Sequence, residues 1–316
     1  MIRVAAIDCG TNTIKLLVAD LEPDTGEQLE LVREMRIVRL GQDVDRTGLF
    51  AEDALARTLG AVDEYAAIID RYDVDAVRFC ATSAARDAGN GEVFRDGVRA
   101  RLGVEPEVVT GDEEAQLSYD GATRALVDVP APILVVDVGG GSTELILGDL
   151  STGSGPQATS HVGAARSLDI GSVRLHERLM PSDPPTPDEV ETASRAIDAA
   201  LDQLPSYGIE LGKAATVVGV AGTVTTVAAV LQGLDAWDRS RIHLARFPVD
   251  DVHALTDRLV AMTVAEREQL HVPPGRSDVI GAGALILDRV LRRTNAGSLL
   301  VSDSDILDGI AWSLTP

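Results

Sequence analysis

The chain has 316 residues, of which 45% are hydrophobic and only 3% aromatic; this length is typical of two domains with sizeable aliphatic cores. Its formal net charge of −22 at pH 7 argues against sequence-independent nucleic-acid binding, because no basic surplus is present to neutralise phosphates. No apolar run is long enough to span a bilayer, so a membrane protein is not expected.

The N-terminal segment predicts a strand, because an acidic residue interrupts its apolar stretch and no cleavage site follows, unlike in a signal peptide. Both cysteines, Cys9 and Cys80, lie in apolar strand-like runs. Two buried thiols without a disulfide framework fit a reducing cytoplasm, where we expect the protein to reside.

The first half of the chain predicts strands alternating with helices. Apolar runs predict strands at residues 2–8, 14–18, 29–40, 76–80 and 107–109. Helices are predicted at 51–71, 91–102 and 112–126, and two glycines predict a loop at 41–48. The proline-containing stretch 126–132 predicts a domain joint.

The order of elements restarts after this joint. Strands are predicted at 133–137, 143–147, near 157–162 and at 214–220, the last leading into a helix. A helix is predicted at 187–204, with Thr186 as its N-cap and Pro187 as its first residue. Three further helices are predicted near 249–262, 277–293 and 304–314.

An internal repeat relates the two halves. The segment IDCGTNTIKLLVAD (7–20) aligns without a gap to VDVGGGSTELILGD (136–149), placing Asp8 on Asp137 and Gly10 on Gly139. Chance similarity of two β-hairpins is the alternative. The shared Asp-x-Gly register and the matching order of later elements favour duplication, with two similar domains facing a cleft.

Each repeated turn has the composition of a phosphate site. Glycine-rich turns leave backbone N–H groups free and allow a phosphate to approach closely. An Asp at the strand end can hold Mg²⁺ directly or through water, and the hydroxyls of Thr11 and Ser142 add donors. Either turn alone is equally consistent with a tight hairpin, and the presence of two copies favours the functional interpretation.

Three other segments carry candidate polar groups. The strand at 217–220 leads into Gly222 and Thr223 at a helix N-terminus, which suits an anion, although close packing of strand and helix through small residues is the favoured explanation of this segment taken alone. Three acidic residues, Asp112, Glu113 and Glu114, open the helix at 112–126, where partnership with the helix dipole is the simpler explanation. Arg86 follows a strand end, where ligands bind in α/β folds. The five histidines show no metal-ligand spacing, so no zinc site is expected.

These elements in this order resemble the exopolyphosphatase/guanosine pentaphosphate phosphohydrolase (Ppx/GppA) family across essentially the whole chain. The matching segments are AAIDCGTNTIKLLVAD, ATSAARDA, TGDEEAQL, VVDVGGGSTELILG, LDIGSVRLHE, GVAGTVTT and RSDVIGAGALIL. The resemblance implies an α/β fold of two duplicated ribonuclease-H-like domains of the actin-like ATPase superfamily, with an interdomain cleft. It implies domains at 1–126 and 127–300, with 301–316 packing back onto the first.

The resemblance also implies roles for individual residues. Glu114, the second Glu of the Glu-Glu-Ala triplet, would be the general base that activates water. Asp137 and Glu144 would hold Mg²⁺ or Mn²⁺. The residues implied to bind substrate phosphates are Asp8, Gly10, Thr11, Asn12, Thr13, Arg86, Gly139, Gly140, Gly141, Ser142, Gly222 and Thr223.

The implied activity is release of terminal orthophosphate from inorganic polyphosphate, of short chain length because the chain lacks the additional C-terminal domains of longer relatives. Guanosine pentaphosphate presents the same terminal phosphoanhydride and remains an alternative substrate. A kinase of the same superfamily and a non-catalytic sensor of guanosine polyphosphates or polyphosphate are further alternatives, and a homodimer is left open. Three residues depart from the family pattern: Lys15, where many relatives carry Arg or His, Leu307, where a basic residue is common, and Asp308, a mild replacement of Glu.

Overall fold

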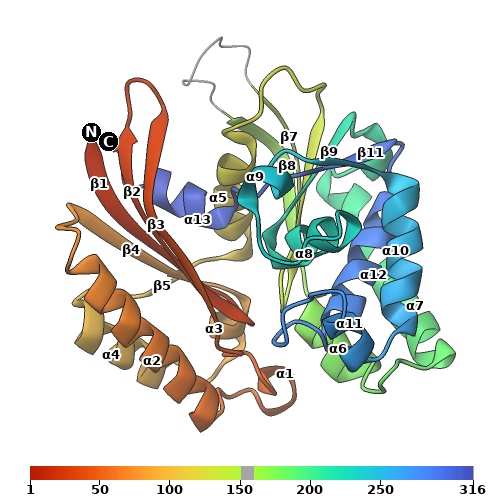
Figure 1. Cartoon of the computed structure of the whole chain (residues 1–316), viewed down its shortest axis with the longest axis horizontal. Coiled ribbons are helices and arrows are strands. Elements are labelled where there is room, and N and C mark those ends of the chain that lie inside the picture. Colours follow the sequence, from red (N-terminus) through yellow and green to blue (C-terminus); the bar gives the residue numbers. More distant parts are fainter. Residues whose placement is uncertain (151–159, 316) are drawn as a thin grey trace. The chain divides into compact units, whose positions relative to one another are not determined.

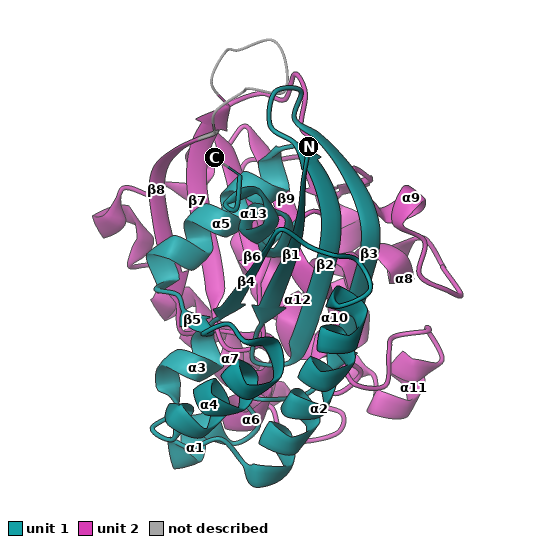
Figure 2. Ribbon diagram, turned by 90° about the vertical axis from the view of Figure 1, so that its left-hand side faces the viewer, with its two compact units in different colours: residues 1–124, 151–160, 305–316 teal, residues 125–150, 161–304 magenta. Residues whose placement is uncertain are grey.

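The computed structural model describes residues 1–150 and 160–315, which form two compact units (Figures 1 and 2). The described part of unit 1 consists mainly of residues 1–124 and 305–315, and that of unit 2 of residues 125–150 and 161–304. The sequence places the joints after residues 126 and 300. In the structure the units change after residues 124 and 304, so the segment 301–304 belongs to unit 2.

Unit 1 is built on a five-stranded sheet in the order β3-β2-β1-β4-β5. Strands β1, β2 and β3 are antiparallel neighbours, whereas β4 and β5 run parallel to β1. The elements are β1 (Ile2–Cys9), β2 (Thr13–Glu22), β3 (Glu27–Ile37), α1 (Val44–Thr47), α2 (Glu52–Ile69), β4 (Ala76–Ala81), α3 (Ser83–Asp87), α4 (Gly91–Leu102), β5 (Glu107–Val108), α5 (Gly111–Thr123) and α13 (Ile306–Trp312).

Helices cover both faces of this sheet, and the central strand β1 is therefore apolar at successive positions. Ala5 and Ile7 face a core shared with α2 and α4, whereas Val4 and Ala6 face a core shared with α5 and α13 (Figure 1). Because side chains alternate along a strand, Asp8 continues the face of Val4 and Ala6. The fold thus directs the Asp8 carboxyl to the side of the sheet that carries α5 and α13.

Helices α5 and α13 cross at unusually close range (Figure 2). A Cβ atom on Gly121 would lie 1.8 Å from the carbonyl oxygen of Asp305, and one on Gly309 would lie 2.0 Å from that of Leu117. No other residue type leaves space for backbone contact of this kind. Two glycines, one on each helix, therefore fix how the segment that follows unit 2 in the chain docks onto unit 1.

Unit 2 is built on a six-stranded sheet in the order β10-β11-β9-β6-β7-β8. Its strands are β6 (Ile133–Val138), β7 (Thr143–Leu150), β8 (Ser160–Leu168), β9 (Thr216–Val220), β10 (Arg246–Pro248) and β11 (Ser298–Val301). Its helices are α6 (Ser172–Leu179), α7 (Pro187–Leu201), α8 (Ala221–Leu231), α9 (Arg239–Ile242), α10 (Val249–Ala261), α11 (Val264–Glu268) and α12 (Ile280–Leu291), with 3₁₀ turns at Leu204–Tyr207 and Leu211–Lys213.

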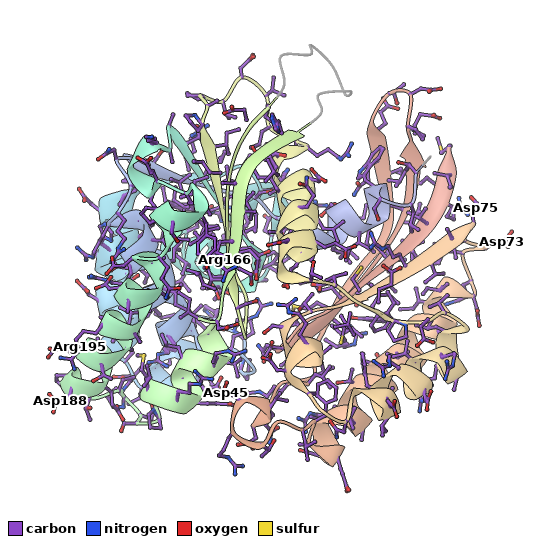
Figure 3. All side chains as sticks on the ribbon, turned by 180° about the vertical axis from the view of Figure 1, so that it is seen from behind. Asp45, Asp73, Asp75, Arg166, Asp188 and Arg195 are labelled. Atoms are coloured by element: carbon purple, nitrogen blue, oxygen red, sulfur yellow. The ribbon has the colours of Figure 1, made fainter. Side chains whose placement is uncertain are left out.

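The largest core of unit 2 lies between its sheet and the helices that pack on it. Helix α7 shows the pattern, because Ile197 and Leu201 face the core while Asp188 and Arg195 point outward (Figure 3). Thr186 caps this helix in a capping box with Glu189, as its sequence predicts. The core-facing stripe of the helix is therefore apolar, and the partly buried Asp198 beside it pairs with Arg289 of α12.

The two sheets share one strand plan. Written as β8-β7-β6-β9-β11, the second sheet repeats the order β3-β2-β1-β4-β5 of the first and adds β10 at its edge. In both, the hairpin strand pair is antiparallel and the next two strands are parallel to the first of the pair. The sequence repeat therefore corresponds to a repeat of topology.

Several short elements were not expected from the sequence. Helices α1, α3, α6, α9 and α11 and strands β10 and β11 have too few residues for a periodic pattern to emerge. Strand β8 extends further along the chain than the strand expected near 157–162, of which 157–159 lie outside the described residues. The longer predicted helices and the central strands are all present.

Candidate functional site

The two repeated turns have the same backbone geometry. The Gly10 amide donates to the carbonyl of Thr13 at 2.9 Å, and the Gly139 amide donates to that of Ser142 at 3.0 Å. Each turn joins two antiparallel strands in equivalent register, with Asp8 opposite Lys15 and Asp137 opposite Glu144. The structures of the turns are therefore alike, whereas the partner of the strand-end Asp is a base in one unit and an acid in the other.

Asp8 lies in a buried ion-pair group that also contains Lys15 and Asp305. The Lys15 Nζ lies 3.4 Å from one Asp8 oxygen and 2.6 Å from one Asp305 oxygen. Burial raises the pKa of the Asp8 carboxyl; Lys15 opposes this rise and Asp305 adds to it. Burial also acts to raise the pKa of Asp305, but Lys15 and Arg33 outweigh it and hold that pKa below its ordinary value.

The first turn is fastened through its carbonyl groups. The Thr11 carbonyl accepts from the Gly41 amide, and the Asn12 carbonyl accepts from the amides of Val38 and Arg39. The Thr11 hydroxyl is buried and has no hydrogen-bond partner among the described residues. Since buried polar atoms are normally satisfied, this hydroxyl fits a site that receives a polar ligand.

Glu113 and Glu114 diverge at the start of α5, where the Thr110 side chain accepts from the Glu113 amide. Glu113 pairs with Arg78 of β4 at 2.7 Å, on the outside of the unit. Glu114 is buried and pairs with Arg86 at 2.6 Å. The geometry thus separates two adjacent acids that the sequence could not distinguish without the family resemblance.

Arg86 lies at the end of the short helix α3 that follows β4. Its guanidinium donates to the Val109 carbonyl at 3.0 Å as well as to Glu114. The structure therefore brings together two of the predicted site residues, Arg86 and Glu114. Arg86 keeps a partly exposed guanidinium, with 24% of its side chain accessible.

The second turn is held by the start of α6. The carbonyls of Gly139 and Gly140 accept from the amides of Ser172 and Val173, and the Arg174 Nε donates to the Gly141 carbonyl at 2.7 Å. These carbonyls belong to the segment that the sequence assigns to phosphate binding. Because α6 binds the carbonyl side of the turn, it fixes the orientation of the glycine peptides.

Asp137 and Glu144 are buried cross-strand neighbours on β6 and β7. Directly opposite residues of antiparallel strands project to the same face of the sheet. The Ser167 hydroxyl of β8 donates to a Glu144 oxygen at 2.6 Å. The adjacent residue of β8, Arg166, is labelled in Figure 3. Its guanidinium lies over the Tyr207 ring, 4.1 Å from the ring centroid.

This donor set fits a hard divalent cation. Mg²⁺ commonly takes one or two carboxylates and completes its coordination with water and substrate phosphates. Within the described residues no cluster of three or more His, Cys, Asp or Glu side chains could hold a metal ion. Asp137 and Glu144 could therefore offer a cation two carboxylates, with water and substrate as its other ligands.

Gly222 and Thr223 lie in the first turn of α8 as predicted. The buried Arg276 guanidinium covers this turn: its Nη1 lies 3.2 Å from the Thr226 hydroxyl and 3.4 Å from the Gly222 carbonyl. Close packing is also present, because a Cβ on Gly219 of β9 would lie 2.7 Å from Val224. Close packing of β9 against α8 is therefore present, and it does not conflict with an anion site at the first turn of α8.

The site residues that the sequence did not predict are mainly arginines and a helix N-cap residue. Arg276 lies within RSDVIGAGALIL and Arg174 within LDIGSVRLHE, two segments that carry the family resemblance, but neither arginine is among the predicted site residues. Asp305 opens DILDG and forms a capping box with Asp308, a spacing that could have been noticed. Leu307, considered as the loss of an anion contact, is buried in the apolar core beneath α13.

Comparison with known proteins identifies the family of the chain. Residues 22–316 match the Ppx/GppA phosphatase family. The chain belongs to the Ppx/GppA phosphatase family. Exopolyphosphatase 2 of Mycobacterium tuberculosis is 47% identical over 99% of this chain and 98% of its own length.

Among solved structures of related proteins, an exopolyphosphatase-like protein shares 43% identity with a TM-score of 0.92, covering 99% of this chain and 97% of the other. The Ppx/GppA family member of Aquifex aeolicus shares 30% identity with a TM-score of 0.79 and the same coverage.

The predicted family and the two-domain actin-like fold are thus confirmed. Ppx/GppA membership also confirms the expected enzyme class, a hydrolase of phosphoanhydride bonds. Within the described residues, no helix has the length and apolar character needed to cross a membrane.

Proposed function

We propose that this Ppx/GppA protein is an exopolyphosphatase that releases terminal orthophosphate from inorganic polyphosphate, with Glu114 as the general base. The ion pair between the buried Glu114 and the partly exposed Arg86 carries the proposal. A carboxylate held in one orientation by an arginine can accept a proton, while the same arginine can contact anionic substrate oxygens. The name of the 47% identical relative, exopolyphosphatase, supports the choice of substrate.

In the proposed reaction, Glu114 takes a proton from the water that attacks the terminal phosphorus. The bond between that phosphorus and the bridging oxygen breaks, and orthophosphate and a polyphosphate shortened by one unit leave. General-base assistance is typically worth ~10²–10⁴ in rate. Arg86 orients Glu114 through the 2.6 Å contact and offsets negative charge nearby.

Asp137 and Glu144 would hold Mg²⁺ or Mn²⁺, with Ser167 orienting Glu144. When bound, the ion would neutralise charge on the phosphate oxygens. The glycine peptides of both turns, with the Thr11 and Ser142 hydroxyls, would donate to phosphate oxygens.

The proposal is tested with Glu114→Gln and the adjacent Glu113→Gln as its matched control. Orthophosphate release is measured from tripolyphosphate, from longer polyphosphates and from guanosine pentaphosphate, with Mg²⁺, with Mn²⁺ and with a chelator. We expect Glu114→Gln to lower kcat by ~10²–10⁴. Glu113→Gln should retain the parental rate, because Glu113 pairs with Arg78 instead. A parental rate in Glu114→Gln would exclude Glu114 as the base.

The same assay separates the other candidates. Faster release from guanosine pentaphosphate than from any polyphosphate would favour the nucleotide as substrate. Transfer from ATP to an acceptor without orthophosphate release would identify a kinase. Calorimetric binding of guanosine pentaphosphate or polyphosphate without turnover in the parent would identify a sensor.

A further inference from the structure

Helix α11 carries an arginine that is almost entirely removed from water. Arg267 is 2% exposed and is among the largest fully buried side chains of the described residues. Within the described part of the chain it forms no ion pair. Burial lowers the pKa of its guanidinium, and the charges of Asp183 and Asp278, which form no ion pair with it, only partly oppose this shift.

Backbone carbonyls, rather than a paired carboxylate, accept the hydrogen bonds of Arg267. The Arg267 Nε donates to Leu259 at the end of α10 at 2.8 Å, and its Nη1 donates to the carbonyls of Ser277 and Asp278 at 2.9 and 3.2 Å. Its Nη2 would lie 3.0 Å from a Cβ on Gly281, so the absence of a side chain there gives the guanidinium its place. Arg267 therefore joins α10 to the segment that precedes α12.

Arg276 lies in that segment, directly before the two residues whose carbonyls Arg267 binds. The amides of Arg276 and Ser277 both donate to the Pro273 carbonyl, at 2.7 and 3.1 Å. The two peptides after Arg276 are the ones that Arg267 binds. The Arg276 carbonyl accepts from the amides of Val279 and Ile280 at 3.1 and 2.8 Å. The position of the Arg276 backbone is thus set by Pro273, by these two amides and by the bonds of Arg267 to the next two carbonyls.

Arg276 in turn lies on the first turn of α8. A Cβ on Gly222 would be 2.6 Å from its Nη2, and its Nη1 approaches the Thr226 hydroxyl at 3.2 Å. Contacts this close tolerate little displacement of the guanidinium. A shift of the 276–278 backbone would therefore move a positive charge away from the helix N-terminus that includes Gly222 and Thr223.

We propose that Arg267 is a positioning residue for phosphate binding, which acts by fixing the 277–278 peptides and so holding Arg276 against the first turn of α8. This inference rests on the proposed function. The planar fork of an arginine can span two backbone segments in fixed directions, which the single ammonium group of a lysine cannot reproduce. Replacing Arg267 leaves three carbonyls without this donor and loosens the 277–278 peptides next to Arg276.

The test compares Arg267→Lys and Arg267→Met with Leu255→Ala as a control. Leu255 is a buried core residue of α10, so its truncation destabilises the same helix without contacting the 276–278 backbone. Steady-state hydrolysis of tripolyphosphate is measured well below each variant's Tm. For both Arg267 variants we expect KM to rise about tenfold and kcat to stay within about twofold of the parent. Leu255→Ala should lower Tm but keep the parental KM.

A double-mutant cycle identifies the route of the effect. If Arg267 acts through Arg276, the KM of Arg267→Met/Arg276→Met will equal that of Arg276→Met alone rather than the product of both effects. Additive effects, or a parental KM in both Arg267 variants despite a lowered Tm, would overturn the inference while leaving the proposed function intact. A parent that neither hydrolyses nor binds tripolyphosphate would overturn both.

Discussion

Replacing Lys15 with Met would leave two buried carboxylates without the cation between them. The Lys15 side chain is 14% exposed, and those of Asp8 and Asp305 are 8% and 9% exposed. At an effective dielectric constant of about 20, its separations of 3.4 and 2.6 Å correspond to gross attractions of about 5 and about 6 kcal/mol. The hydration that the lysine regains on unfolding offsets much of this attraction. Removing one partner from a buried ion pair therefore costs a net of about 3–5 kcal/mol.

We therefore expect Lys15→Met to lower the free energy of unfolding by about 3–5 kcal/mol at pH 7. The loss should shrink as pH falls. Without Lys15 the folded-state pKa of Asp8, which burial already raises, rises further above its unfolded value. Asp305 loses a cation that lowers its pKa, while Arg33 remains. A raised pKa favours folding fully only below the unfolded value. The deficit is therefore largest at neutral pH and decreases as the carboxyls take up protons toward pH ~4.

Urea unfolding at pH 7, 5.5 and 4 measures both effects. The matched control is Lys213→Met, the only other lysine of the chain, whose pair with Glu210 is exposed and should contribute little. A Lys15→Met variant as stable as Lys213→Met, or a deficit that does not change with pH, would refute the account of this ion-pair group.

Two further variants test packing and the proposed metal ligands. Gly309→Ala should lower the free energy of unfolding by about 3 kcal/mol or more in urea, because its Cβ would lie 2.0 Å from the Leu117 carbonyl oxygen. The control Gly60→Ala, on an open face of α2, should instead stabilise the protein slightly. Equal changes in stability for the two variants would contradict the close crossing of α5 and α13. Ser167→Ala removes the hydroxyl that orients Glu144, so the Mg²⁺ concentration for half-maximal orthophosphate release should rise ~10-fold or more, and an unchanged Mg²⁺ requirement would argue against a metal role for Glu144.

The hairpin register could be predicted from the sequence because it is a local property. A turn of fixed length between two apolar runs determines which residues lie opposite each other, so the gapless alignment already placed Lys15 and Glu144 at equivalent positions. The central strands and long helices likewise have enough residues for a periodic pattern. The order of the elements, and the duplication of that order in the two halves, could be predicted from these strands and helices.

Contacts between distant segments could not be predicted in this way. Lys15 and Asp305 are 290 residues apart in the chain, and Arg276 and Gly222 are 54 apart. The choice between Glu113 and Glu114 depends on two arginines from elsewhere in unit 1, Arg78 and Arg86. Neither periodicity nor spacing contains this information, because burial and partners are set only when separate elements pack together.

The assignment of α13 to unit 1 has a consequence for the order of folding during synthesis. Residues 125–304 must all be made before the residues of α13 are available, so unit 1 waits for its last helix while unit 2 is already complete. During that interval the apolar side chains of β1 and β2 that α13 later covers, including Val4 and Leu17, are open to water, and Asp8 lacks its Asp305 neighbour. Chaperone binding to nascent chains should therefore persist until residues 305–315 leave the ribosome.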